Sequence, residues 1–153
     1  MSKHETAPTS VDPADVGLQF LTVAHQVKDV VDQHMAKAGL SLSRTKVLQL
    51  LARRGALHQA ELAEALGQAP RSVTQAVEAL ERLQLVTRTG DPEDRRRKTV
   101  SLTDQGRTAL AAGEEAGRQI LQQIFGTLDA HQLARMETLL GHTDTAARRS
   151  IAR

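Results

Sequence analysis

The feature that most constrains the fold is a pair of short helical segments followed at once by two β-like runs. Residues 59–83, QAELAEALGQAPRSVTQAVEALERL, carry apolar residues at steps of three and four on both sides of Gly67 and Pro70. Gly67 suits the left-handed end of one helix, and Pro70 suits the first position of the next. The sequence therefore predicts two short helices that meet at a tight turn and pack through their apolar faces.

The polar face of the second helix carries side chains that suit DNA. In a helix-turn-helix the second helix enters the major groove. Arg71 can bond guanine O6 and N7, Gln75 can bond adenine N6 and N7, and hydroxyl groups can contact phosphates or bases. The pattern therefore predicts a DNA-contacting set: Arg71, Ser72, Thr74 and Gln75. The alternative interpretation of these residues is the solvated face of an ordinary bundle helix.

An arginine-rich turn lies between the two β-like runs, residues 85–89 and 99–102, with DPEDRRRK between them. Two strands and a basic loop directly after a helix-turn-helix make a winged helix. Arginine is attracted to a narrow minor groove, so we expect Arg95, Arg96 and Arg97 to contact DNA. We expect Asp94 to pair with Arg96 and hold its guanidinium in one orientation. A run of four basic residues by itself could equally be a solvated loop.

Long helical segments flank this middle part of the chain. Asp12-Pro13 is a typical helix start, and an apolar stripe runs from Val16 to Met35. The sequence predicts further helices that begin near Thr103 and near Asp129. We expect a flexible tail at 1–12, a helical dimerisation region at 13–39 and 103–153, and a DNA-binding lobe at 40–102.

Composition excludes several classes of function. The chain has 153 residues with no cysteine, which excludes disulfides, thiolate catalysis and thiol redox sensing. A formal charge of +2 permits a nucleic-acid partner without requiring one. The N-terminal segment lacks the apolar core of a signal peptide, and no run reaches the length of a membrane span. We therefore expect a cytoplasmic protein with no membrane partner.

Residues 61–110, ELAEALGQAPRSVTQAVEALERLQLVTRTGDPEDRRRKTVSLTDQGRTAL, resemble the MarR family of bacterial transcriptional regulators. The motifs that carry the resemblance are ELAEALG, VTQAVEALERLQLV, DPEDRR and SLTDQGR, and they lie within residues 40–112. The family's wing aspartate and arginine correspond to Asp94 and Arg96, and its base-contacting segment to residues 71–75. Many relatives have glycine at the position of Gln84, so we expect the recognition helix to end differently here.

The resemblance implies a fold and a function. The expected fold is mainly α with a small antiparallel β wing, in which a winged helix-turn-helix lobe joins a helical dimerisation region in an intertwined homodimer. The expected function is sequence-specific transcription regulation, typically repression at a pseudopalindromic operator on double-stranded DNA. A dimer is also favoured because one recognition helix contacts few base pairs, whereas two helices about 34 Å apart contact both half-sites.

The family also implies a small-molecule effector, often an anionic aromatic compound, bound between the dimerisation helices and the lobe. We expect Phe20, His25 and Arg44 to be candidate ligand contacts, although structural or surface roles remain the alternative for each. Six histidines are present without a close i, i+4 pair, so we expect no metal site and no cofactor.

Three classes of function are alternatives for this chain: an enzyme, a protein-binding module and a DNA-binding regulator. An enzyme is disfavoured because the sequence has no nucleophile-base arrangement, no glycine-rich phosphate loop and no metal motif. A winged helix that binds protein instead of DNA is disfavoured by the arginine-rich turn. A DNA-binding regulator, with or without an effector, is the interpretation that the residues favour.

Overall fold

In the computed structural model, which describes residues 10–152, the chain forms helices and three short strands. Their order is α1 (Pro13–Ala36), α2 (Leu42–Arg54), β1 (Leu57–His58), α3 (Gln59–Leu66), α4 (Pro70–Arg82), β2 (Val86–Gly90), β3 (Lys98–Leu102), α5 (Asp104–Phe125) and α6 (Ala130–Ile151). This arrangement confirms the expected mainly helical fold with a small antiparallel wing. Residues 1–9 of the expected tail lie outside the described part of the chain.

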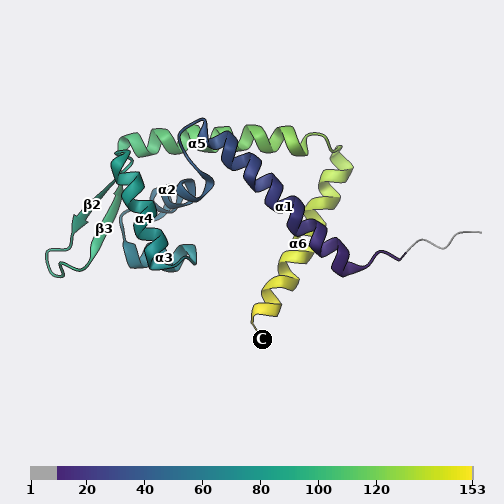
Figure 1. Ribbon diagram of the computed structural model, residues 1–153, viewed down its shortest axis with the longest axis horizontal. Coiled ribbons are helices and arrows are strands. Elements are labelled where there is room, and N and C mark those ends of the chain that lie inside the picture. The colour runs from purple at the N-terminus through teal and green to yellow at the C-terminus, as the bar shows by residue number, and fades with distance from the viewer. Residues whose placement is uncertain (1–9, 153) are drawn as a thin grey trace, which may run out of the picture.

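The helices form a lobe, which contains α2, α3 and α4, and two arms, α1 and α6, with α5 connecting the lobe to α6. Figure 1 shows α2, α3 and α4 gathered beside the wing at one end, with α5 running from the lobe to the far end. From there α6 turns away, while α1 extends outward from the lobe beneath α5. The wing and the recognition helix α4 therefore lie far from α6 and from the N-terminal end of α1.

The hydrophobic core belongs to the lobe. Side chains with no measurable exposure come from α2, α3, α4 and β3, and they are Leu48, Leu62, Val73, Val77, Leu80 and Val100. Burial of such apolar area contributes about 25 cal/mol per Å². In contrast, α6 has no buried residue in the single chain.

Side-chain caps fix the helix starts that the sequence predicts. The carboxylate of Asp12 accepts from the Ala14 N–H at 2.9 Å, and the Ser41 hydroxyl accepts from the Arg44 N–H at 3.3 Å. Thr103 caps α5 and Asp129 caps α6 in the same way. The first helix ends at Ala36, and the chain then turns through Gly39 at φ +91°.

The sheet has one strand more than the expected hairpin. Its order is β1-β3-β2, and all pairs are antiparallel. Leu57 pairs with Val100 and His58 with Thr99, so β1 covers the outer edge of β3. A two-residue strand has no alternation that a sequence could reveal, because its conformation depends on the edge that it pairs with.

Two glycines of α5 allow the junction between α1 and α2 to pack closely. A Cβ at Gly113 would lie 3.1 Å from Leu40 Cδ1, and one at Gly117 would lie 3.3 Å from Met35 Sδ. Both Leu40 and Met35 are buried. Because Gly113 and Gly117 have no side chains, α1 and the lobe can pack closely against α5.

α4 ends in a left-handed turn at Gln84. Gln84 has φ +61°, a left-handed conformation that costs a non-glycine residue about 1–2 kcal/mol. The Leu85 N–H donates to the Leu80 carbonyl at 3.0 Å, and the Gln84 N–H donates to the Glu81 carbonyl at 2.9 Å. These two bonds form a Schellman motif, in which glycine is the usual residue at this position.

Replacing Gln84 by glycine is therefore expected to stabilise the fold. The side chain of Gln84 is exposed, so its loss removes little packing, while the left-handed strain is relieved. We expect Gln84→Gly to raise the free energy of unfolding by about 0.5–1 kcal/mol in urea titration. Gln68→Gly, at a position without positive φ, is the control and should destabilise. A loss of stability in Gln84→Gly would contradict the assignment of strain.

A carboxylate on α1 holds the start of α2. Asp32 Oδ1 accepts from the Leu42 N–H at 2.8 Å, and its Oδ2 accepts from Lys28 Nζ at 2.9 Å. The Lys28 ammonium, more than the Leu42 N–H, holds the pKa of Asp32 below its ordinary value of 3.8, although partial burial opposes this. Asp32 thus links α1 to the lobe.

This link predicts a pH dependence. Because the folded-state pKa of Asp32 is lowered, its contribution to stability is complete above the ordinary pKa and is lost as pH falls through the folded pKa. Asp32→Asn keeps an acceptor for Leu42 but cannot titrate, so we expect a loss of about 0.5 kcal/mol at neutral pH that vanishes in acid. Urea titrations from neutral to acid pH measure it, with Glu137→Gln on α6 as control. An equal difference at every pH would contradict the prediction.

Candidate nucleic-acid interface

The recognition helix α4 separates a buried face from a polar face. Pro70 occupies its first turn, and Val73, Val77 and Leu80 are buried against the lobe. Ala69 at the N-cap makes no side-chain hydrogen bond, which leaves the start of the helix without a side-chain cap. The fold therefore presents the opposite face of the first turns to solvent, where Arg71, Ser72 and Gln75 are exposed.

Thr74 lies apart from these three residues. It is half-buried, and its hydroxyl donates to the Pro70 carbonyl at 3.0 Å and accepts from Gln59 Nε2 at 3.1 Å. The bond to Gln59 joins α4 to the first residue of α3. In this geometry the hydroxyl holds the two helices together, whereas Arg71, Ser72 and Gln75 carry no such contact in residues 10–152.

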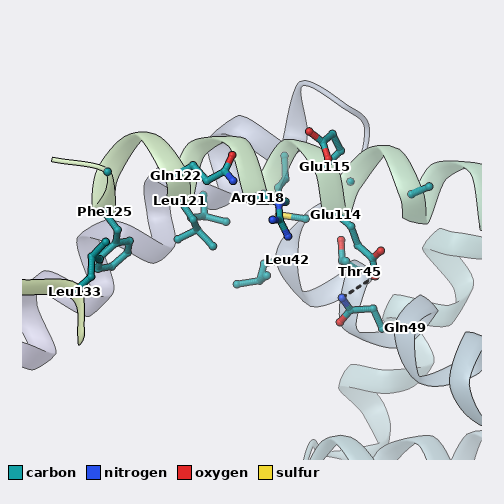
Figure 2. A pocket seen from close by; sticks show the side chains of 16 residues that line it. Leu42, Thr45, Gln49, Glu114, Glu115, Arg118, Leu121, Gln122, Phe125 and Leu133 are labelled. Carbon is teal, nitrogen blue, oxygen red and sulfur yellow. Dashed lines mark hydrogen bonds between the residues drawn. The ribbon is translucent and has the colours of Figure 1, made fainter. Parts of the chain in front are cut away.

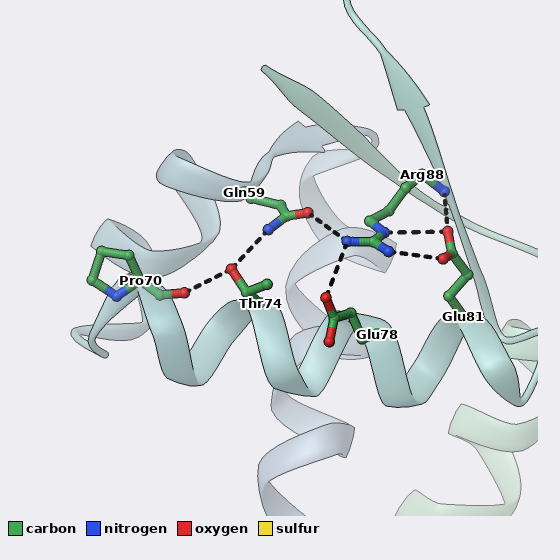
Figure 3. Close-up of polar contacts among 6 residues, drawn as sticks. All are labelled: Gln59, Pro70, Thr74, Glu78, Glu81 and Arg88. Carbon is green, nitrogen blue, oxygen red and sulfur yellow. Dashed lines mark hydrogen bonds and ion pairs between the residues drawn. The ribbon is translucent and has the colours of Figure 1, made fainter. Parts of the chain in front are cut away.

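An arginine in β2 joins the wing to the recognition helix (Figure 3). Arg88 Nη2 donates to Glu81 Oε1 at 3.0 Å and its Nε donates to Glu81 Oε2 at 3.3 Å, while its backbone N–H donates to Oε2 at 3.2 Å. Glu78 lies 3.9 Å away, and Gln59 Oε1 accepts from Nη1 at 3.5 Å. The side-chain hydrogen bond between Arg88 and Glu81 lowers the pKa of Glu81 and raises the pKa of Arg88.

This cluster fixes the wing relative to α4 and α3. A two-point guanidinium–carboxylate pair is strong and directional. The positioning roles of Arg88, Glu81 and Gln59 are not evident from the sequence. The available signal was a basic residue in a β-like run with acids near the end of the preceding helix, and only the packing of β2 on α4 brings them together.

The tip of the wing is folded by its acids. Asp91 Oδ1 accepts from the Glu93 N–H at 2.9 Å, and Asp94 Oδ1 accepts from the Arg96 N–H at 3.0 Å. These are Asx turns, in which a side chain imitates a backbone turn. The Asp91 N–H donates to the Arg97 carbonyl at 3.0 Å and closes the loop.

The role expected for Asp94 therefore changes. It orients Arg96 through the backbone N–H, and the expected ion pair between the two side chains is absent from the described residues. Arg95, Arg96 and Arg97 are all exposed, and none forms a salt bridge within residues 10–152. The tip thus presents three guanidinium groups without internal partners, as a DNA-contacting wing requires.

A second site lies between the arms and the lobe. A cavity of about 850 Å³ lies beneath α5, bounded by α1, α2 and the start of α6. Figure 2 shows the side chains that line it. Apolar side chains such as Met35, Leu121 and Phe125 line it together with Thr45, Gln49 and Arg118. The Gln49 amide donates to Glu114 at 3.0 Å across one edge.

None of the three predicted ligand residues lines this cavity. Phe20 and His25 are exposed on α1, where His25 lies 3.4 Å from Asp29, and Arg44 is half-buried on α2. Their assignment stays a prediction. Within residues 10–152 no three His, Cys, Asp or Glu side chains converge on a metal position. No helix in that part of the chain is long and apolar enough to cross a membrane.

The fold and the polar surface together define a winged helix-turn-helix protein of the DNA-binding class. A sequence profile of the MarR family matches residues 40–98, from Leu40 to the first residue of β3. The repressor NicR of Pseudomonas putida is 33% identical, with 85% of this chain and 87% of NicR aligned. The repressor MdtR of Bacillus subtilis is 31% identical over 61% of this chain, and the match spans 60% of its own length. The chain belongs to the MarR family.

Solved structures are similar over most of the chain. Bordetella bronchiseptica BpsR, whose DNA binding is regulated by 6-hydroxynicotinic acid, has a TM-score of 0.71 and 25% identity, with 85% of this chain and 98% of BpsR covered. A mutant of Escherichia coli MarR in complex with operator DNA has a TM-score of 0.70 and 21% identity, with 84% and 93% covered. The second comparison shows a shared fold. Both the family and the fold are those of transcriptional regulators and not of enzymes.

Proposed function

We propose that this protein is a transcriptional repressor that binds a pseudopalindromic operator as a homodimer. The observation that carries the proposal is the joint placement of two polar surfaces on one lobe. The exposed first turns of α4 and the unpaired arginines of the wing are held in fixed relation by the Arg88–Glu81 pair. Family membership makes DNA the expected partner of such a lobe.

The placement of these polar surfaces on the lobe also supports a division of the chain into two functional regions. We assign DNA binding to residues 40–102 and dimerisation to 13–39 and 103–153. The arms expose apolar side chains that a single chain leaves in water, among them Val16, Leu18, Phe20, Leu21, Leu139 and Leu140. Contiguous exposed apolar surface marks an interaction site. A second copy of the same arms is the partner that buries them.

Each lobe would use two grooves. Arg71, Ser72 and Gln75 would contact base edges in the major groove, with Thr74 holding α3 to α4 behind them. Arg96 would enter the minor groove, and Arg95 and Arg97 would contact phosphates. Two recognition helices about 34 Å apart would then contact successive turns of the same DNA face.

We further propose that a small aromatic carboxylate releases the repressor from DNA. The cavity beneath α5 offers apolar walls, the ring of Phe125 and the exposed cation Arg118, which forms no salt bridge in residues 10–152. A ligand that binds there would favour one spacing of the lobes over another. 6-Hydroxynicotinic acid, the regulator of BpsR, is the first compound to titrate against the protein–DNA complex. Release that is unchanged in Arg118→Gln would contradict this assignment, and no release by any aromatic acid would indicate a constitutive regulator.

A DNA-binding regulator acts where the chromosome is, so we propose that the protein works in the bacterial cytoplasm. Footprinting on DNA upstream of its own and neighbouring genes tests the function. A protected dyad with two half-sites about one turn apart is expected. Absence of any protected site would contradict the proposal.

Base contact by α4 has its own test. In selection from random DNA, Gln75→Ala is expected to relax the preference at one position of each half-site by about 1–3 kcal/mol. Arg71→Ala is expected to do the same at another position. Ala79→Ser on the same helix is the control and should leave the selected motif unchanged. Identical motifs from wild type and both variants would show that these residues do not contact bases.

A further inference from the structure

A small basic pocket lies at the base of the wing. It has a volume of about 110 Å³ and lies between the end of β1 with the start of α3 on one side and the basic end of the wing on the other. Its lining residues are His58, Gln59, Ala60, Arg96, Arg97 and Lys98. This wing-base pocket exists because β1 pairs with β3, which places His58 opposite Thr99. Neither His58 nor Lys98 has a role in the DNA contacts described above.

The imidazole of His58 is held in place from one side. Its Nδ1 lies 3.2 Å from Thr99 Oγ1, within hydrogen-bond distance. When the hydroxyl donates to Nδ1, the proton of the neutral ring is on Nε2, which then becomes a donor. The carboxylate of Glu61 lies 4.0 Å from Nε2, beyond hydrogen-bond distance, and accepts instead from the His58 backbone N–H at 3.1 Å. In this tautomer the Nε2–H group has no acceptor at bonding distance within residues 10–152.

The opposite wall is cationic and unpaired. Arg97 and Lys98 are exposed, and no carboxylate lies within salt-bridge distance of either in the described part of the chain. Neighbouring like charges repel one another, and an anion placed between them relieves that repulsion. A donor on one wall and two cations on the other suit a tetrahedral oxyanion.

The position of the pocket identifies the anion. Gln59, which lines it, also donates to Thr74 of the recognition helix at 3.1 Å. The pocket thus lies between the wing and the start of α3, which this bond joins to α4. The wing and α4 are the two elements proposed to enter neighbouring grooves. The DNA feature between a major and a minor groove is the sugar–phosphate strand that separates them.

We propose that the wing-base pocket binds one backbone phosphodiester of DNA, with Arg97 and Lys98 as its cations and His58 Nε2–H as its hydrogen-bond donor. The proposal rests on the proposed DNA-binding function and adds residues to it. Such a contact fixes the register of the lobe on the duplex and carries no sequence information. It differs in this respect from Gln75 and Arg71, whose contacts would distinguish bases.

Salt dependence of binding measures the contact. Each phosphate contact that is lost lowers the slope of log K against log salt by about 0.9, hence by about 1.8 for a dimer with two pockets. We expect Lys98→Gln and Arg97→Gln to lower the slope equally on the footprinted site and on an unrelated duplex. Arg135→Gln removes the same charge from α6 and should leave the slope unchanged. Circular dichroism and gel filtration verify that each variant is a folded dimer.

Chemical change of the DNA locates the phosphate. A single uncharged methylphosphonate is placed in turn at each position of the footprinted strand. At one position per half-site it should weaken binding by the wild type. At that same position it should not weaken binding by Lys98→Gln or His58→Leu any further. Because only the DNA is altered, this result identifies a backbone phosphate as the occupant. If the variants respond like the wild type at every position, the pocket does not bind DNA phosphate. Failure of the proposed function is distinct, since the wild type would then give no footprint at all.

Discussion

Gly106→Ala is expected to lower the free energy of unfolding by about 3 kcal/mol, the cost of overpacking a site that cannot expand. Gly106 is buried in the first turn of α5, within the SLTDQG motif. A Cβ there would overlap the carbonyl oxygen of Leu85 and lie 2.7 Å from Leu102 Cδ1. The Leu85 carbonyl cannot move away cheaply, because it accepts from the Thr103 N–H at 3.1 Å. Thermal unfolding should show a melting temperature about 6–12 °C below that of the wild type.

Gly141→Ala is the matched control for this substitution. Gly141 lies in α6 with no atom within 4 Å of an added Cβ, so alanine there should stabilise the helix by up to about 1 kcal/mol. A melting temperature of Gly106→Ala equal to that of the wild type would show that α5 can shift away from the lobe. The glycine of the motif is then not required by this packing.

Much of the fold could be predicted because its signals are local. The caps at Asp12, Ser41, Thr103 and Asp129 each depend on a hydroxyl or carboxylate only two or three residues from the N–H that it accepts from. The recognition helix has its apolar residues at a strict helical step, and these are the residues buried in the lobe. Such patterns survive in the sequence because they depend on few neighbours.

The contacts that the sequence did not reveal are tertiary. His58 becomes part of a strand only because β3 offers a free edge, and Arg88 meets Glu81 only because β2 packs on α4. Thr74 was expected on the DNA-facing surface, yet its hydroxyl is bonded to Gln59 on a neighbouring helix. Two side chains one helical step apart can be of the same type although one faces solvent and the other turns inward, so residue type and spacing do not distinguish them.

The candidate effector site shows the same limit. Phe20 and His25 lie on one helix and are suitable residue types, but the cavity forms where four helices meet and is lined by residues such as Met35, Arg118 and Phe125. The walls belong to segments far apart in the chain. Gly117 on α5 lets Met35 of α1 approach closely, so that α1 forms one of these walls.

Arg96→Ala is expected to weaken operator binding more than tenfold, equivalent to about 1.4 kcal/mol, while the dimer stays folded. Arg96 is exposed at the wing, its backbone N–H is fixed by Asp94 at 3.0 Å, and its guanidinium has no salt bridge in residues 10–152. Truncation therefore removes a DNA contact without breaking an internal one. Mobility-shift titration of wild type and variant on the same operator measures the effect.

The neighbouring Arg95 supplies the control, because Arg95→Ala removes the same charge from the same exposed loop. Its effect should be smaller and should decrease steeply with salt, as for a phosphate contact. Binding through Arg96 should instead depend on the width of the minor groove, since a narrow A·T-rich minor groove attracts an inserted arginine. Replacing A·T pairs under the wing by G·C pairs should weaken the wild type but leave Arg96→Ala almost unchanged. Equal losses in the two proteins would mean that Arg96 does not lie in the minor groove.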